Sequence, residues 1–205
     1  MSENTEQRSD PHRTMSQAMI SEMLIKNFDK LTNFDQKTLM YGSLYLGANA
    51  GFTGLIANSM LRRVLNVGAA RIVANLPMAV LPILVTPAVY NVLVSNRLVK
   101  GELDCLPCTL SQGALIGMFI GGLYPIVLAL PLNLGLTARY ESALLPEKSN
   151  LLRFSWTILQ PVIKKMLPVL IFQAFIGSYL GYMQFQAYTN LVQITFSNSD
   201  DLNRM

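Results

Sequence analysis

Four long stretches that contain no charged residue and no histidine dominate this chain. They cover residues 38–61, 72–96, 105–138 and 166–199. A helix of about 20 mostly apolar residues is enough to cross the hydrocarbon core of a bilayer, which is about 30 Å thick. Each stretch exceeds that length. The sequence therefore predicts an all-α, polytopic membrane protein with four transmembrane helices and an N-terminal amphipathic helix.

The composition agrees with a membrane protein. Only 14% of the 205 residues are charged, whereas a soluble domain usually carries about 25%. The pI near 9.1 reflects cations that flank the uncharged stretches, where they set orientation, so we expect no nucleic-acid partner. We predict a polar head over residues 1–37, a four-helix transmembrane domain over 38–186 and a C-terminal tail over 187–205.

The head begins with a polar segment, residues 1–14, which we expect to be disordered. Its acidic residues Glu3, Glu6 and Asp10 argue against an ordinary mitochondrial transit peptide, so we expect targeting information to lie inside the chain. Apolar residues then recur at helical spacing over about residues 15–34. This pattern predicts an amphipathic helix that lies on the membrane surface or on its own bundle, or that docks a partner.

Prolines interrupt the second and third stretches. Pro77, Pro82 and Pro87 recur every five residues, and an interior proline removes a backbone donor and bends a helix. Either all three prolines lie inside the helix and bend it, or Pro77 is its first residue, a position that proline suits, and the helix runs from there to about Ser95 with two kinks. Pro125 should kink the third span.

Three of the four stretches carry glycines spaced four residues apart. Small residues at this spacing let two helices approach closely inside a membrane. The pattern predicts either a tightly packed bundle or a protein–protein interface within the membrane. The glycines concerned are Gly47, Gly51, Gly113, Gly117, Gly121, Gly177 and Gly181.

The longest loop is expected over residues 139–165, and its second half holds the only tryptophan, Trp156. Trp prefers the membrane–water interface, so we predict an interfacial helix that leads into the fourth span. Cations gather in the loops after the first and third spans, which places these loops in the cytosol or matrix and both termini opposite. Arg62, Arg63 and Arg71 belong to this set and either set orientation only or also contact anionic lipid or a matrix partner.

Residues that usually mark chemistry inside membranes are missing from the stretches. Transport and catalytic sites there normally contain ionisable side chains, and the sole histidine, His12, lies in the head. Asn49 and Asn58 are expected to bridge helices by hydrogen bonds rather than to bind substrate. We therefore predict a protein that is not an enzyme, with no cofactor and no small-molecule substrate.

Cys105 and Cys108 form a CxxC motif at the start of the third stretch. The spacing fits half of a zinc site, a redox-sensitive dithiol or a disulfide. Zinc needs further ligands, and the chain offers no other cysteine and only the remote His12. A thioredoxin-type role needs a βαβ context that we do not expect here. The motif stays open between an unassigned loop pair, a redox pair and a metal site.

Several runs resemble the transmembrane protein 126 family of mitochondrial membrane proteins. They are GLIANSMLRRVLNV at 54–67, ARIVANLPMAVLPILVT at 70–86, GELDCLPCT at 101–109 and IGGLYPIVLALPLNLGLTARYESALLP at 120–146. The similarity covers most of the chain, roughly residues 38–180. The ELDCxxC, GGLYP and ARYxSALLP elements are closer to the A-type paralogue than to the B-type.

The resemblance implies a multi-pass protein of the mitochondrial inner membrane that assists the assembly of respiratory complex I, the NADH–ubiquinone oxidoreductase. It implies a non-catalytic assembly factor or chaperone that acts on membrane-arm intermediates, whose partners are complex I membrane subunits, other assembly factors and membrane lipid. The glycine stripes add the hypothesis that such a chaperone shields small-residue faces of nascent subunits. The main alternative is a small-solute transporter or channel subunit, with the proline-rich span lining its pathway. A membrane-embedded oxidoreductase that uses Cys105 and Cys108 is a further alternative.

Overall fold

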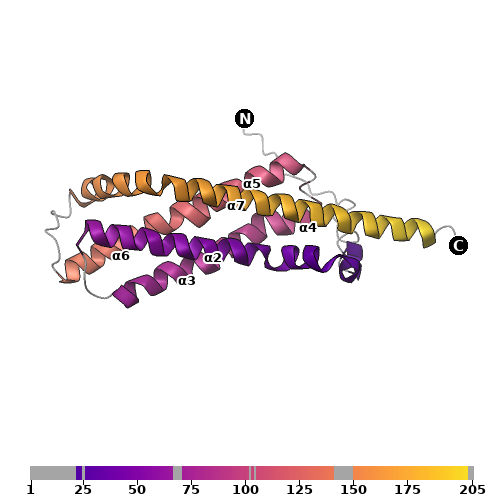
Figure 1. The fold of residues 1–205 in the computed structure, drawn as a ribbon, viewed down its shortest axis with the longest axis horizontal. Coiled ribbons are helices and arrows are strands. Elements are labelled where there is room, and N and C mark those ends of the chain that lie inside the picture. The colour runs from indigo at the N-terminus through magenta and orange to yellow at the C-terminus, as the bar shows by residue number, and fades with distance from the viewer. Residues whose placement is uncertain are drawn as a thin grey trace, which may run out of the picture.

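The structure, a computed structural model, describes residues 22–24, 26–66, 71–101, 103, 105–140 and 150–202. Within these residues every regular element is helical, which confirms the predicted all-α class. Figure 1 labels the α-helices α2 to α7. The elements are η1 (Phe28–Lys30), α2 (Asn33–Val64), α3 (Arg71–Tyr90), η2 (Asn91–Ser95), α4 (Asn96–Val99), α5 (Leu106–Met118), η3 (Phe119–Leu123), α6 (Tyr124–Tyr140) and α7 (Leu151–Leu202).

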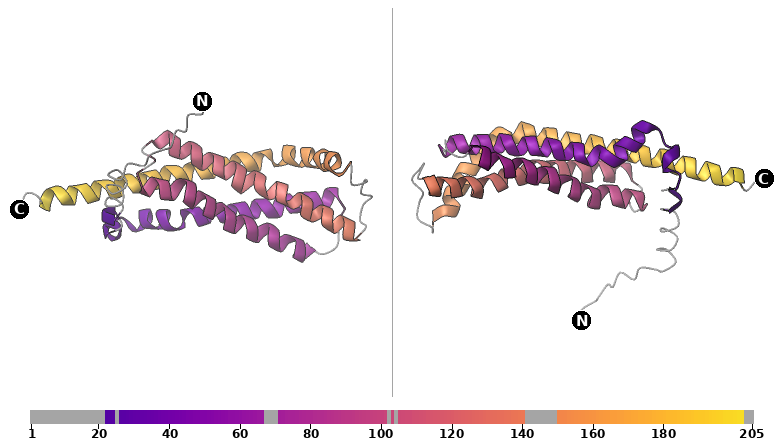
Figure 2. Two further views of the ribbon diagram at one scale, coloured as in Figure 1. Left: turned by 180° about the vertical axis from the view of Figure 1, so that it is seen from behind. Right: turned by 90° about the horizontal axis from the view of Figure 1, so that it is seen from below.

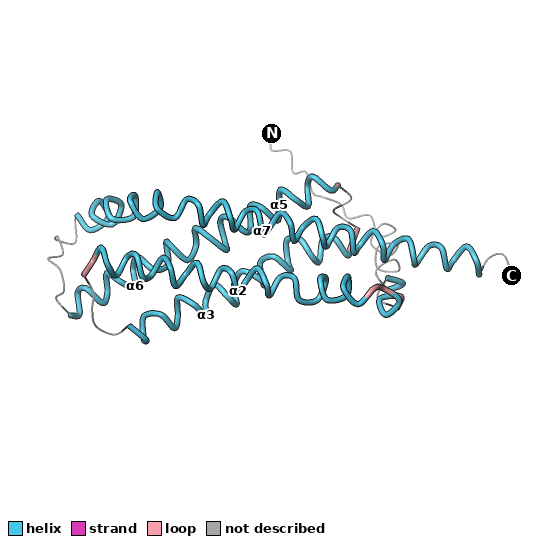
Figure 3. The backbone as a smooth tube through the Cα atoms, in the orientation of Figure 1, coloured by secondary structure: helices cyan, strands magenta, loops and turns pink. Residues whose placement is uncertain are grey.

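The helices form an elongated bundle (Figures 1 and 2). α2 packs on α3, α6 and α7, and α5 packs along α7. The ends of α2 and α6 and the starts of α3 and α7 lie at one end of the bundle, whereas η1 and α4 lie at the other. We call the first the loop end and the second the head end. The last turns of α7 extend beyond the head end, as the tube in Figure 3 shows.

The proline-rich helix contains all three prolines and ends later than the sequence predicts. α3 starts at Arg71, so Pro77 lies inside the helix and is not its first residue. The prediction treated each proline as a boundary or a kink, but membrane helices accept interior prolines where neighbouring helices compensate for the lost backbone bond. Beyond Tyr90 the helix continues through the π-helical segment η2 and α4 to Val99.

A second π-helical segment, η3, separates α5 from α6. It ends immediately before Tyr124 and Pro125, and Pro125 lacks the N–H that would continue regular α-helical bonding to the preceding turn. The irregularity that the sequence predicts at Pro125 is therefore a local change of helix type, a common response inside α-helices.

α7 is much longer than the fourth span that the sequence predicts. It runs from Leu151 to Leu202 with Pro161 and Pro168 inside it. The expected interfacial helix around Trp156 is thus continuous with the span, and residues 187–202 extend the same helix where a tail was expected. Residues 141–149 of the expected loop lie outside the described residues.

The head differs from a single helix over residues 15–34. Residues 1–21 lie outside the described residues, but η1 ends at Lys30 and Leu31 is extended, with φ −73° and ψ 151°. The chain then enters α2 at Asn33, five residues before the expected span. Leu24 and Leu31 are buried in one cluster with Leu191 of α7, so this part of the head packs on its own bundle.

Three helical segments are long and apolar enough to cross a membrane, namely Asn75–Val99, Leu106–Arg139 and Arg153–Ser197. They identify a multi-pass membrane protein. α2 is not among them, because its asparagines and glycines lower its mean hydropathy.

Candidate functional site

Where α2 packs on α3, glycines of α2 lie against backbone carbonyls of α3. These carbonyls lack their helical hydrogen-bond donor because a proline occupies the donor position. A proline has no N–H to offer the carbonyl four residues earlier, so Pro82 leaves the oxygen of Met78 without its helical donor. A Cβ added at Gly54 of α2 would lie only 2.2 Å from that oxygen. The absence of a side chain at Gly54 lets its Cα–H group approach the carbonyl, a contact that recurs between closely packed helices.

The same arrangement repeats further along the two helices. Pro87 frees the carbonyl of Ile83, and a Cβ at Gly47 would lie 2.8 Å from that oxygen and 2.8 Å from the Pro87 ring. Gly51, between the two contacts, makes room for the Ile83 side chain, whose Cγ1 would be 2.6 Å from an added Cβ. Glycines of α2 and prolines of α3 therefore form one interlocked surface.

The contact between α5 and α7 is reciprocal. A Cβ at Gly113 would lie 2.3 Å from the carbonyl oxygen of Gly177, and a Cβ at Gly177 would lie 2.1 Å from that of Gly113. Gly117 and Gly181 likewise face carbonyl oxygens of the other helix, at 2.3 Å and 2.9 Å from an added Cβ. The backbones of α5 and α7 touch here with no side chain between them.

Each glycine predicted from spacing faces another helix of this chain. Gly121 does so less tightly, since a Cβ there would lie 3.6 Å from Gln173 Oε1 and 3.7 Å from Ala50. Sequence reasoning missed Gly54, which belongs to the same stripe as Gly51 but not at the four-residue spacing. A role for these glycines toward a partner protein stays a prediction.

A buried hydrogen-bonded chain of asparagines joins three helices near the loop end. Asn58 of α2 donates to Asn75 Oδ1 of α3 at 2.6 Å, and Asn133 of α6 donates to Asn58 Oδ1 at 2.6 Å. The side chains of Asn58 and Asn133 are fully buried. The expectation that Asn58 bridges helices is confirmed, whereas Asn49 donates to Tyr45 O of its own helix. Asn49 is not on the face that meets the buried interior.

Two glutamines of α7 extend the polar contacts toward the head end. Gln173 donates to Thr53 Oγ1 of α2 at 2.7 Å in the buried interior. Gln184 accepts from Ser95 Oγ at 3.1 Å and donates to the carbonyl of Thr38 at 3.3 Å. Such bonds fix the register between helices that lipid alone would not specify.

Cys105 and Cys108 lie in the first turn of α5. Cys105 is the N-cap residue, and its Sγ accepts from the backbone N–H of Cys108 at 3.3 Å. Both side chains are exposed free thiols. Among the residues that the structure describes, no three His, Cys, Asp or Glu side chains are grouped to hold a metal ion.

The arginines at the end of α2 have different environments. Arg62 is buried, with 7% of its surface exposed, and lies one turn after Asn58. Arg63 is exposed. Arg63 is therefore available for the predicted contact with lipid or a matrix partner, whereas Arg62 belongs to the interior. The side chain of Arg71 lies outside the described residues.

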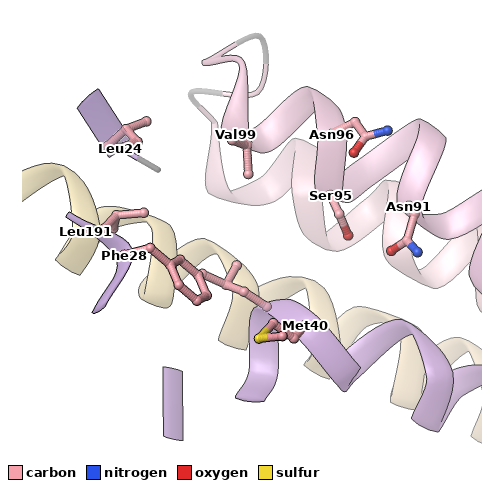
Figure 4. Close-up of a pocket in the computed structure, with 9 residues that line it drawn as sticks. Leu24, Phe28, Met40, Asn91, Ser95, Asn96, Val99 and Leu191 are labelled. Carbon is pink, nitrogen blue, oxygen red and sulfur yellow. The ribbon is translucent and has the colours of Figure 1, made fainter. Parts of the chain in front are cut away.

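A cavity of about 340 Å³ lies at the head end, where the head meets α2, α7 and the η2–α4 segment (Figure 4). One wall is apolar, with Leu24, Phe28 and Met40, and in Figure 4 the polar side chains of Asn91 and Ser95 extend toward it. Two of its lining residues, Asn91 and Ser95, belong to the π-helical segment η2, and such segments are frequent at functional sites.

The family model described as Transmembrane protein 126 matches residues 18–198. The chain belongs to this family. It is 44% identical to mouse "Transmembrane protein 126A" over 88% of this chain and 92% of that protein. It is 45% identical to the human protein of the same name over 83% of this chain and 87% of the relative.

The chain is less similar to the TMEM126B proteins. Mouse "Complex I assembly factor TMEM126B, mitochondrial" is 30% identical over 80% of this chain and 70% of that protein. None of these relatives carries the name of an enzyme. No solved structure matches the chain.

The run at residues 54–67 that resembles the TMEM126 family has a structural explanation. Its residues 54–64 form the last part of α2 and supply Gly54, Asn58 and Arg62 at four-residue spacing, all of them buried. Gly54 contacts α3, and Asn58 bonds to both α3 and α6. This TMEM126 run is therefore the central contact of the loop end of the bundle.

Proposed function

We propose that this chain is a non-catalytic assembly factor for respiratory complex I that resides in the mitochondrial inner membrane and acts on membrane-arm intermediates. The observation that carries the proposal is its relationship to the TMEM126B proteins, whose name describes a mitochondrial complex I assembly factor. Membrane subunits of complex I and other assembly factors would be its partners.

The packing of the bundle is consistent with a binding function carried out on its outer surface. Its glycine faces and the buried asparagines and glutamines contact other helices of the same chain. Large apolar side chains, by contrast, remain exposed along α3 and α7, for example Leu76, Leu84, Ile171 and Phe172. A partner helix would therefore meet these outer faces rather than the glycine stripes.

We further propose that α2 is a fourth span. Its 32 residues reach about 48 Å at 1.5 Å per residue, which exceeds the thickness of the hydrocarbon core. Its outward face carries exposed Tyr41, Tyr45, Phe52 and Ile56. With four spans, the cation-rich loops lie on the matrix side and both termini on the other side.

Cysteine accessibility tests this placement. In a background with Cys105 and Cys108 changed to Ser, Phe52→Cys should resist a membrane-impermeant maleimide in intact vesicles and react after detergent is added. The matched control Lys100→Cys, at an exposed position beyond α4, should react when its side of the membrane faces the reagent. Free reaction of Phe52→Cys in sealed vesicles of both orientations would show that α2 lies outside the membrane.

Complexome profiling of mitochondria with and without this protein tests the assembly function. We expect the protein to co-migrate with partial complex I intermediates, and its loss to leave those intermediates stalled. Re-expression of the wild-type chain should restore mature complex I, and the Cys105→Ser, Cys108→Ser double variant should do so equally. Normal complex I in the absence of the protein would refute the proposal, and failure of the double variant alone would instead favour a redox role.

A further inference from the structure

We infer that the groove between the start of α2 and the second half of α7 binds an anionic phospholipid, with the headgroup phosphate at Lys37 and an acyl chain along the aromatic wall. This inference rests on the proposed membrane placement of α2. It does not depend on complex I. No relative's name includes a lipid.

The groove is long, apolar and open on the outside of the bundle. It has a volume of about 460 Å³ and runs where α2 and α7 lie side by side (Figure 1). Tyr41 and Tyr45 of α2 form one wall, and Phe175 and Tyr179 of α7 form the other. The rings of Phe175 and Tyr179 are stacked, with centroids 6.5 Å apart and planes 9° from parallel. The lining of the groove is therefore mostly apolar and aromatic.

Lys37 is the cationic residue that lines the groove, and it lies at the membrane boundary. The hydrogen bonds of Gln184 to the carbonyl of Thr38 and to Ser95 place these three residues at one level of the bundle. The candidate span that contains Ser95 ends at Val99. The candidate span on α7 continues past Gln184 to Ser197, so we take the membrane boundary from the span that ends at Val99. With that boundary, Lys37 lies at the depth of lipid headgroups, and Tyr45 lies two turns deeper, where acyl chains are.

Lys37, the charged residue of the groove lining, favours an anion. The nearest acid on α2, Asp35, accepts a hydrogen bond from Asn190 of α7 at 3.1 Å, so its carboxylate is directed to α7. Lys37 itself is exposed. Lysines and aromatic rings together are typical of membrane interfaces, and a basic residue near the surface attracts anionic lipid.

The shape of the groove favours a flexible chain over a second helix. Helices in membranes approach closely through small residues. The small residue of this groove is Gly42, and the space of its Cβ is already filled by Leu180 Cδ1, 2.5 Å away. The other apolar lining residues are bulky, namely the aromatic rings of both walls with Ile176, Leu180 and Met183. An acyl chain fits between them, and a helix of about 10 Å diameter does not.

Native mass spectrometry of the full chain in detergent, with added phosphatidylglycerol or phosphatidylcholine, tests the inference. We expect phosphatidylglycerol to be retained preferentially, and Lys37→Gln to reduce that preference about fivefold, the effect of one basic residue near a charged membrane surface. Lys100→Gln, an exposed cation at the same end but outside the groove, should leave the preference unchanged. An equal loss in both variants, or no loss in Lys37→Gln, would overturn the headgroup assignment.

The aromatic wall needs a separate pair of variants. Tyr45→Ala and Phe175→Ala should weaken the binding of phosphatidylglycerol and of phosphatidylcholine to the same extent. Each removes part of the aromatic wall that contacts the acyl chain and leaves the charge unchanged. Phe52→Ala is the control, since Phe52 is as exposed as these residues but lies outside the groove. The same effect from all three would mean unspecific annular lipid and would overturn the site. Because the assay uses the purified chain, its failure would leave the assembly proposal intact.

Discussion

The close backbone contact between Gly177 of α7 and Gly113 of α5 gives the sharpest test of the fold. In Gly177→Ala, the new Cβ would begin 2.1 Å from the carbonyl oxygen of Gly113, whereas ordinary contact starts near 3.4 Å. α5 and α7 must separate by roughly 1.3 Å at this point, and backbone cannot move aside as a side chain can. A gap of 0.5–1 Å already removes about a quarter to a half of each van der Waals contact.

The free energy can be estimated from these terms. Overpacking a filled interface costs about 1–3 kcal/mol, and the loss of close Cα–H···O contacts adds about 0.5–1 kcal/mol for each one broken. Replacement of Gly by Ala in a helix stabilises the helix by roughly 1 kcal/mol, because alanine has the higher helix propensity. We therefore expect Gly177→Ala to lower the free energy of unfolding by about 1–3 kcal/mol.

Gly135→Ala is the matched control. Gly135 lies inside α6, and no atom lies within 4 Å of the position that its Cβ would occupy. The same substitution should there raise stability by about 0.5–1 kcal/mol, because only the propensity term remains. SDS titration of both variants in mixed micelles, followed by circular dichroism, measures the two values. Equal effects, or no loss in Gly177→Ala, would refute the backbone contact between α5 and α7.

Three further comparisons test the interior and the helix cap. Asn58→Ala should cost about 1–2 kcal/mol in the same titration, because Asn75 and the buried Asn133 each lose the hydrogen bond that Asn58 makes with them; a neutral result would contradict the asparagine chain. Cys105→Ala should lower the free energy of unfolding by about 0.5–1 kcal/mol, because it removes the N-cap of α5. Cys105→Ser and Cys108→Ala should stay close to wild type. Equal losses in the two alanine variants would count against the cap. Arg62→Gln should destabilise the bundle by about 1 kcal/mol or more, whereas exposed Arg63→Gln should change it by at most about 0.5 kcal/mol; the reverse order would mean that Arg62 is not the buried residue.

Hydropathy and residue spacing predicted the helical class and the small faces of the helices. They did so because a chain that crosses lipid must satisfy its backbone hydrogen bonds within long apolar helices, and because small residues allow such helices to pack closely. The boundaries could not be predicted in the same way. Pro161 and Trp156 indicate a break and an interface when they are considered alone, but α7 continues through both, since tertiary packing stabilises a helix beyond what local propensity allows.

The partners of the small residues were hidden for a different reason. Spacing shows that Gly47 and Gly51 line one face of α2, but it does not show which helix that face meets. Gly54 was missed because its importance comes from Met78 O, a carbonyl freed by a proline on another helix. A local pattern cannot reveal a contact whose cause lies more than twenty residues away in the chain.

The proline and glycine patterns are therefore one feature rather than two. In α3, Pro82 and Pro87 create acceptors without donors, which would be costly in lipid, and α2 presents Gly54 and Gly47 to those acceptors. α5 and α7 solve the same problem of close approach without proline, through reciprocal glycines. Once these faces are closed against each other, the surfaces left for function are the outer ones. That is why the partner and the lipid are both assigned to exposed aromatic and aliphatic side chains, and why glycine substitutions should affect assembly only through loss of the bundle itself.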